Sequence, residues 1–425
     1  MVSRWVTATA IGPNAPRPTH AMTDRSPRDQ ARRHGRQRHG RRRRGAAGIA
    51  CLIAGVAWSA ARPAEPLAWQ PLPALPDALG VAGPFVGIHA GALIVAGGAN
   101  FPVAAGEDRW AAPKRWHAAT WVLPAAESQP SAWQAAAPLD RPLASGAVAS
   151  IPQGVVCIGG DDGTAATAEV FLLTWDPAAG TLARRPLPRL PGPLTSAGAA
   201  AIGSVVYVAG GQHGPGLATA GAGFLRLDLS GLDRLGPGVP VPGLRWEPLP
   251  DVPGGPRSLP VVVAAGGPRP RVHVMSGRRR RDGGAANAID ALVDHHAFDP
   301  GDFRADQSGG WHRRADLPRP TMAGSAAPLG ARHLIVVSGD DGALWEKTAT
   351  LRDAHPGFPP FALRHDTVAD VWEPLPAPPV HQLATPAVAL ADGFILVSGE
   401  VRPRWRSPAT WRVTTGHTVP AATGR

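Results

Sequence analysis

The chain has 425 residues, of which 44% are apolar, so it is long enough to bury a sizeable core. Its 51 glycines and 48 prolines argue against a helical protein and suit many short strands joined by turns. The formal net charge is +11, but residues 1–65 hold 13 arginines and 3 acidic residues, so the remaining 30 basic and 29 acidic residues nearly cancel. We therefore expect no nucleic-acid binding by the folded part, because such binding needs a basic face.

The N-terminal region has the layout of an export signal. Residues 1–45 form a basic extension, which we expect to be disordered, and residues 46–61, AAGIACLIAGVAWSAA, add sixteen apolar or small residues. A basic region before a short apolar region is typical of a secretory signal peptide, whereas a permanent span needs roughly twenty residues. We therefore predict export to the periplasm or the extracellular space. The alternative is an uncleaved N-terminal anchor, which would be the one membrane contact. Cleavage would leave Cys157 as the single cysteine, without a disulfide or a cysteine metal cluster.

An internal repeat dominates the rest of the sequence. One phrase, a β-branched apolar strand closed by glycine, occurs six times at a spacing of about fifty to sixty-seven residues. This spacing is close to that of a kelch-type blade with insertions. The six copies are GALIVAGG (91–98), GVVCIGG (154–160), SVVYVAGG (204–211), RVHVMSG (271–277), HLIVVSG (333–339) and GFILVSG (393–399).

A second phrase, a tryptophan followed by a proline-rich exit, accompanies the first. It occurs at residues 69–76, 133–142, 246–253, 311–320 and 372–379, and residues 183–191 replace it in the second repeat without the tryptophan. We attribute these tryptophans to packing between blades.

Six copies of both phrases predict an all-β fold, a six-bladed kelch-type β-propeller with four-stranded blades over residues 66–418, followed by a tail at 419–425. The first tryptophan phrase precedes the first glycine phrase, and the sixth glycine phrase has no tryptophan phrase after it. We therefore expect the N-terminal strand to complete the last blade and close the ring, which removes exposed sheet edges.

The residues after each glycine should occupy equivalent loops on one face, near the axis. These loops read ANFP (99–102), DDGT (161–164), QHGP (212–215), RRRRDGG (278–284), DDGALWEK (340–347) and EVRPRWR (400–406). Polar side chains around one mouth suit a small polar ligand such as a sugar, and Asn100, His213, Arg278 and Asp340 are candidates to bind it. The alternative is ordinary turn formation for the aspartates and a solvated loop for Arg278 and its neighbours. His295 and His296 lie on a later strand, where we expect packing or surface roles.

Glu400 is the candidate catalytic residue. It directly follows Gly399, and three arginines follow it within six residues. A carboxylate beside cations is held ionised, which suits a general base, while Arg402 and Arg406 are placed to bind an anionic ligand. The alternative is a structural ion pair that stabilises the loop.

Three longer stretches of the sequence resemble a known family. GPFVGIHAGALIVAGGANFP, SGDDGALWEKTATLRDAHPGFPPFALRHDTVADVWEPLP and LVSGEVRPRWRSPATWRV are similar to the N-acetylneuraminate epimerases, or sialic acid mutarotases, and more specifically to their cyclically permuted branch. The resemblance covers nearly all of residues 67–416. The family's GE-basic-P-x-x-R motif maps onto Gly399, Glu400, Arg402, Pro403 and Arg406; Arg404 and Trp405 depart from its usual small and variable residues.

The resemblance implies an isomerase that interconverts the α and β anomers of sialic acid or a related sugar acid by acid/base ring opening. It places the proton acceptor at Glu400 and the clamp for the sugar carboxylate at Arg402 and Arg406. This chemistry requires no metal and no redox cofactor. The alternative function is a non-catalytic kelch-repeat propeller that binds a glycan or a protein partner, since a propeller fold does not itself imply catalysis.

Overall fold

The computed structural model describes residues 66–415, apart from 104–105, 129, 131, 233–242, 286, 305 and 307–308. The predicted extension at 1–45, the apolar segment at 46–61 and the tail at 419–425 lie outside the described residues. Within the described part, the one α-helix is α1 (Thr348–Leu351), with short 3₁₀ turns at η1 (Leu217–Thr219), η3 (Trp345–Lys347) and η4 (Arg352–Ala354). No helix in this part is long and apolar enough to cross a membrane.

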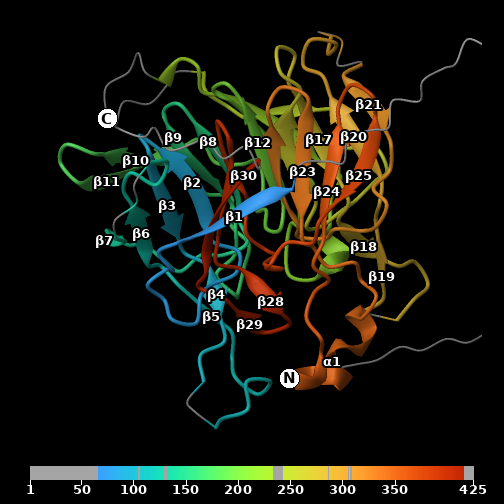
Figure 1. The fold of residues 1–425 in the computed structure, drawn as a ribbon. Coiled ribbons are helices and arrows are strands. Elements are labelled where there is room, and N and C mark those ends of the chain that lie inside the picture. Colours follow the sequence, from blue (N-terminus) through green and yellow to red (C-terminus); the bar gives the residue numbers. More distant parts are fainter. Residues whose placement is uncertain are drawn as a thin grey trace, which may run out of the picture. The chain divides into compact units, whose positions relative to one another are not determined.

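Six four-stranded antiparallel sheets form the blades of a propeller, as the repeats predicted (Figure 1). The innermost strands are β2 (Phe85–His89), β8 (Ala147–Ile151), β12 (Gly198–Ile202), β16 (Val261–Ala265), β22 (Ser325–Leu329) and β26 (Val388–Leu390). The second strands are β3 (Ala92–Ala96), β9 (Gly154–Ile158), β13 (Val205–Ala209), β17 (Arg271–Met275), β23 (His333–Val337) and β27 (Gly393–Val397). The third strands are β6 (Thr120–Leu123), β10 (Val170–Asp176), β14 (Phe224–Asp228), β20 (His295–Phe298), β24 (Ala362–Asp366) and β30 (Thr410–Thr415). The outermost strands are β7 (Gln134–Ala136), β11 (Thr181–Leu187), β15 (Glu247–Leu249), β21 (Trp311–Arg314), β25 (Val371–Leu375) and β1 (Leu67–Leu72).

The N-terminal strand closes the ring. β1 pairs antiparallel with β30, with Leu67 opposite Thr415, so the last blade takes its outermost strand from the start of the chain. Near the axis, the hydroxyl of Ser398 accepts a hydrogen bond from the Val81 N–H at 2.7 Å, and the Gly399 N–H donates to the Val81 carbonyl. The two ends of the propeller are therefore joined at both the rim and the centre, and the predicted closure is confirmed.

The glycine phrases are the second strands, which are almost completely buried between blades. The tryptophans lie at or beside the outermost strands. In four blades the indole N–H donates to a backbone carbonyl of the preceding blade at 2.8–2.9 Å. The four pairs are Trp133 with Pro73, Trp246 with Pro188, Trp311 with Pro250 and Trp372 with Ala315. Each of these rings covers apolar surface and also fixes the spacing of two blades, because its polar edge finds a partner.

A ring of six backbone hydrogen bonds encircles the axis where the innermost strands begin. One residue in each blade donates its N–H to the carbonyl of the equivalent residue in the preceding blade, and the last link joins the first blade to the sixth. All six residues have φ between 54° and 65°, although only one is glycine. They are Gly83, Ser145, Ser196, Leu259, Ala323 and Ala384. Because this left-handed backbone is strained for residues with a Cβ, the closed ring of bonds must hold it in place.

Three short ribbons extend from the loops at one end of the propeller. They are β4 (Ala99–Asn100) with β5 (Arg115–Trp116), β18 (Arg278–Arg280) with β19 (Ile289–Ala291), and β28 (Glu400–Arg402) with β29 (Trp405–Arg406). In Figure 1 these ribbons and α1 gather at the lower end of the view. This end carries the loops that follow the glycine phrases.

Candidate functional site

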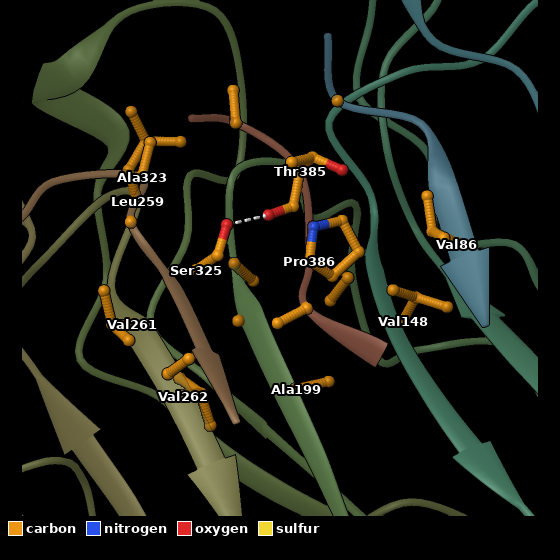
Figure 2. A pocket seen from close by; sticks show the side chains of 18 of the residues that line it. Val86, Val148, Ala199, Leu259, Val261, Val262, Ala323, Ser325, Thr385 and Pro386 are labelled. Carbon is orange, nitrogen blue, oxygen red and sulfur yellow. Dashed lines mark hydrogen bonds between the residues drawn. The ribbon is translucent and has the colours of Figure 1, made fainter. Parts of the chain in front are cut away.

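The blades surround an axial cavity of about 590 Å³. The innermost strands of all six blades line it with small and apolar side chains, including Val86, Val148, Ala199 and Val262 (Figure 2). Four charged side chains from the loops complete the lining: Lys114, Arg278, Glu400 and Arg406. The wall therefore combines small apolar side chains with hydroxyl-bearing residues such as Ser150, Ser325 and Thr385, and the charged groups that could fix a ligand all belong to one end of the propeller.

The repeat places six residues at equivalent positions at this end. Each lies directly after its glycine. Each also forms an antiparallel bridge to the residue that precedes, in the same blade, the residue taking part in the ring of six backbone hydrogen bonds. The six are Ala99, Asp161, Gln212, Arg278, Asp340 and Glu400. Only Arg278 and Glu400 among them line the cavity.

Glu400 is held in a defined orientation at the start of β28. Its Oε1 accepts a hydrogen bond from the Arg404 N–H at 2.9 Å and lies 2.5 Å from a terminal nitrogen of Arg406. Arg404 has φ 69° in the turn between β28 and β29, which directs its N–H back at the carboxylate. Within the described part of the chain, the other oxygen, Oε2, has no hydrogen-bond partner. The Glu400 side chain is 20% exposed, so it can still meet a ligand.

Arg406 lies deeper than Glu400, with only 5% of its side chain exposed. Its Nε donates to the Ala99 carbonyl at 3.3 Å, and its guanidinium stands 5.2 Å from the centre of the Phe101 ring. These contacts fix the planar group between the first and last blades. A guanidinium held in this way is preorganised to bind a carboxylate.

Two further cations line the cavity, and each packs against an aromatic ring. The Lys114 ammonium stands 4.6 Å from the centre of the Trp116 ring, and the Arg278 guanidinium stands 4.2 Å from that of Trp345. Burial lowers the pKa of Lys114 and also the pKa of Arg278. Three cations and one carboxylate therefore line the cavity, an arrangement that favours an anionic ligand.

Of the residues predicted to bind the ligand, Arg278 and Arg406 line the cavity and Asn100, His213, Asp340 and Arg402 do not. Asn100 is buried, and its amide is occupied by the Gly80 carbonyl at 3.0 Å and by His117 at 2.8 Å. His213 contacts the Pro193 carbonyl at 3.1 Å.

The alternation of side chains along extended backbone accounts for two of these positions. Asn100 and His213 each lie one residue beyond the equivalent bridging positions, which are Ala99 and Gln212. Successive side chains of a strand point to opposite faces, so one residue of offset takes them away from the axis.

Asp340 occupies the equivalent position but accepts a hydrogen bond from the Gly342 N–H at 2.9 Å. Burial raises the pKa of its carboxyl. Arg402 lies beyond an irregularity in the pairing of β28, packs 4.3 Å from the centre of the Trp405 ring and donates to the Asp353 carbonyl at 3.0 Å. Arg402 thus joins two loops, and the inward position belongs to Arg406.

Asp353 connects the loops of three blades beside the mouth. Its Oδ1 accepts hydrogen bonds from the indoles of Trp110 at 3.0 Å and Trp405 at 3.4 Å. Arg404 donates from its Nε to the Arg109 carbonyl at 2.9 Å and packs 3.9 Å from the centre of the Phe101 ring. The insertions of the first and fifth blades and the hairpin of the sixth are thereby held together.

Comparison with known proteins gives partial sequence matches and extensive similarity to solved structures. No established family profile matches the chain. An N-acetylneuraminate epimerase of Yersinia pestis (strain Pestoides F) is 34% identical over 132 residues, which are 28% of this chain and 32% of that protein. An N-acetylneuraminate epimerase of Brucella suis is 37% identical over 105 residues, 23% of this chain and 26% of that protein. The chain thus spans about a third of the length of the curated relatives it matches.

A solved structure described as "Structure of YjhT" superposes with a TM-score of 0.54, covering 81% of this chain and 99% of that one. The sequence identity over this superposition is 12%. This likeness supports the propeller fold and carries no statement about activity.

Proposed function

We propose that the protein interconverts the α and β anomers of a sugar acid, sialic acid or a close relative, by acid/base ring opening. The observation that carries the proposal is the charged set Glu400, Arg406, Arg278 and Lys114 at one end of the axial cavity. An oriented carboxylate supplies a base, and the excess of cations suits a substrate with its own carboxylate. The partial matches to N-acetylneuraminate epimerases support the same substrate class.

In the proposed reaction, Glu400 accepts the proton of the anomeric hydroxyl while Lys114 donates a proton to the ring oxygen. The bond between the anomeric carbon and the ring oxygen breaks, its electron pair stays on the ring oxygen, and a carbonyl forms at the anomeric carbon. After the carbonyl group rotates, the same transfers run in reverse and close the ring on the opposite face. Both protein groups return to their starting states, so the cycle consumes nothing.

Lys114 is proposed as the proton donor because it lines the cavity and its pKa is lowered by burial. A lysine with a lowered pKa gives up its proton more readily near neutral pH, which suits a general acid. The arginines remain protonated, so they suit binding and charge stabilisation and not proton transfer. Arg406 and Arg278 would bind the sugar carboxylate, and Arg406 also keeps Glu400 oriented.

We also propose that the N-terminal segment directs export and that the chain belongs to the cyclically permuted branch of this family. Export would place the enzyme where it meets free sugar acids outside the cytoplasm. The assignment to the cyclically permuted branch rests on the sequence phrases alone, among them LVSGEVRPRWRSPATWRV.

The proposal is tested by anomer exchange of N-acetylneuraminic acid, measured by NMR saturation transfer. The test variant is Glu400→Gln, and the matched control is Glu247→Gln, because Glu247 also contacts an arginine, Arg226, but lies on an outermost strand. We expect acceleration by the wild type and by Glu247→Gln, and the buffer rate with Glu400→Gln. Saturable binding of the sugar acid without acceleration by the wild type would instead support the binding-protein function.

A further inference from the structure

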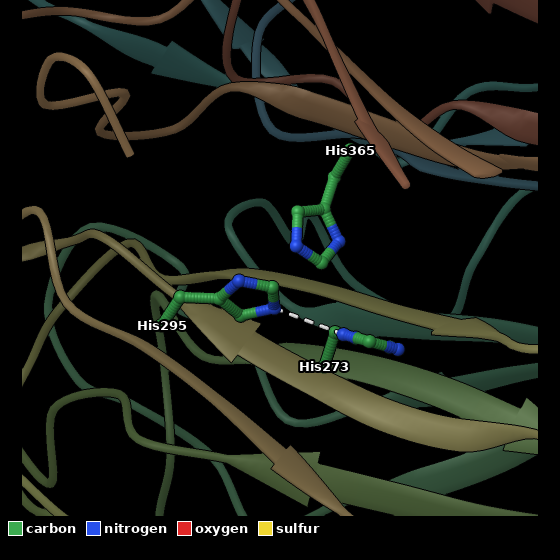
Figure 3. Close-up of side chains that lie close together, drawn as sticks. All are labelled: His273, His295 and His365. Atoms are coloured by element: carbon green, nitrogen blue, oxygen red, sulfur yellow. Dashed lines mark hydrogen bonds between the residues drawn. The ribbon is translucent and has the colours of Figure 1, made fainter. Parts of the chain in front are cut away.

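Three histidines meet in the interior between the fourth and fifth blades. His273 lies on β17, His295 on β20 and His365 on β24, and each is at most 1% exposed. Figure 3 shows the His365 ring facing the pair formed by His273 and His295. One ring nitrogen from each residue can be chosen so that all three lie within 4.8 Å of one another. None of the three lines the axial cavity, so the cluster is separate from the proposed active site.

The cluster has more buried polar nitrogens than hydrogen bonds. Nδ1 of His273 lies 2.9 Å from Nε2 of His295, and one proton can serve that contact. The remaining nitrogens of these two rings, and Nδ1 of His365, form no hydrogen bond of ordinary geometry. Leaving buried polar groups unsatisfied costs free energy, so this arrangement needs an explanation.

The outer contacts hold His365 as a ligand would be held. Its Nε2 lies 3.0 Å from Oδ1 of Asp370, and this oxygen also accepts the Ala315 N–H at 3.0 Å and pairs with Arg314 at 3.2 Å. An imidazole that donates one N–H to a carboxylate presents the lone pair of its other nitrogen, and metal-binding histidines are oriented in this way. For His365 the nitrogen left over is the buried, unpartnered Nδ1.

The other two rings have backbone oxygens on their outer sides. The carbonyl of Ala265 lies near the His273 ring and that of Ala315 near the His295 ring, although neither contact reaches the geometry of an ordinary hydrogen bond. An outer carbonyl that accepts the N–H of a ring leaves the inner nitrogen of that ring with its lone pair, the form that binds metals.

We propose that His273, His295 and His365 form a structural site for one divalent zinc ion, which joins the fourth blade to the fifth. Imidazole nitrogens suit zinc, and the three rings would supply three of the four ligands of a tetrahedral ion, in which bonds of about 2.1 Å place two ligands roughly 3.4 Å apart. The contact between His273 and His295 is shorter than this, at 2.9 Å, and one nitrogen of each ring lies within 4.8 Å of the others, so the rings must move to bind the ion. In the bound form, the ion replaces the hydrogen bond between His273 and His295, and both rings use their inner lone pairs. The zinc ion would take no part in the proposed reaction, and the proposal of this site does not depend on the proposed function.

The test measures zinc bound to the full chain. Because the site is buried, zinc is supplied during expression and, in a second preparation, during refolding, and loosely bound metal is removed by dialysis against a chelator. We expect about one zinc ion per chain by elemental analysis in the wild type, and a melting temperature that falls when the protein is refolded with chelator. Refolding with cobalt should produce the visible absorption of a tetrahedral site.

Variants identify the ligands. His365→Gln should hold less than about a fifth of the wild-type zinc, whereas the control His89→Gln, at a half-buried histidine of the first blade, should hold as much as the wild type. If His365→Gln does not fold, Asp370→Asn decides, because loss of the carboxylate behind a ligand lowers metal affinity about 10- to 100-fold. Folded wild-type protein without zinc or cobalt after both preparations would overturn the proposal, as would undiminished zinc in folded His365→Gln or unchanged affinity in Asp370→Asn.

Discussion

Replacement of Lys114 by arginine separates the charge of this residue from its ability to donate a proton. Both side chains are cationic and can stand over the Trp116 ring, but arginine does not release its proton in proteins. If Lys114 is the general acid, Lys114→Arg should keep KM for the sugar acid within about threefold while kcat falls about 100-fold, the lower end of the usual contribution of general acid–base catalysis.

Two further variants complete the design. Lys114→Met removes both the charge and the proton, so we expect the same loss of kcat and, in addition, a KM about tenfold higher, because one charge-assisted contact is lost. The matched control is Lys347→Arg at an exposed lysine of η3, which should leave both constants unchanged.

The pH dependence follows from the direction of the pKa shift. A general acid works in its protonated form, so the wild-type rate should fall as pH rises through the pKa of Lys114, which burial places below the ordinary value for lysine. The residual rate of Lys114→Arg should lack this alkaline decline. Anomer exchange measured by NMR across the alkaline range provides the assay. A Lys114→Arg enzyme with full kcat would refute the role of Lys114 as proton donor, and a wild-type rate that is flat in this range would do the same.

Three further changes test the charge of the cavity, the closure of the ring and the contacts between the loops. Arg278→Met should weaken binding of the sugar acid about tenfold in calorimetry, with no effect on a neutral sugar, because one of the three cavity cations is lost; equal weakening for both ligands would contradict the charge argument. Deletion of residues 66–80 should abolish cooperative thermal unfolding of the whole domain, because β1 closes the sixth blade; a truncated chain that melts like the full chain would show that closure is dispensable. Asp353→Ala should increase hydrogen exchange in residues 106–112 and 400–406, because Asp353 accepts from Trp110 and Trp405; unchanged exchange in both segments would show that the loops are held by other contacts.

The architecture could be predicted from the sequence because each repeat is one blade. A buried strand closed by glycine and a strand with a tryptophan recur in the same order in each repeat. The number of copies predicts the number of blades, and their order along the chain predicts that β1 closes the ring. The phase also identified the six equivalent positions after the glycines, which is why Glu400 and Arg278 were found as cavity residues.

The phase of the repeat does not determine side-chain directions within the loops. Asn100 and His213 are displaced by one residue from the equivalent positions, and an irregularity in β28 turns Arg402 toward Asp353. Lys114 was missed because it lies in the insertion before β5, where the repeat gives no register.

The histidine cluster was also beyond the reach of the sequence. Its members lie on three strands of two blades; His295 follows His273 by 22 positions, and no motif links either to His365. His295 was expected to be a packing or surface residue; it is completely buried and contacts His273. Only the packing of β17, β20 and β24 brings the three rings together.

The most direct test of the proposed function is the rate of anomer exchange of N-acetylneuraminic acid with and without the folded wild-type protein. We expect a rate that is higher than that of buffer, saturates with substrate and depends on the free carboxylate of the sugar, so that the methyl ester is a poor substrate. A rate equal to that of buffer, with a protein whose circular dichroism and cooperative melting show a folded propeller, would contradict the proposed function.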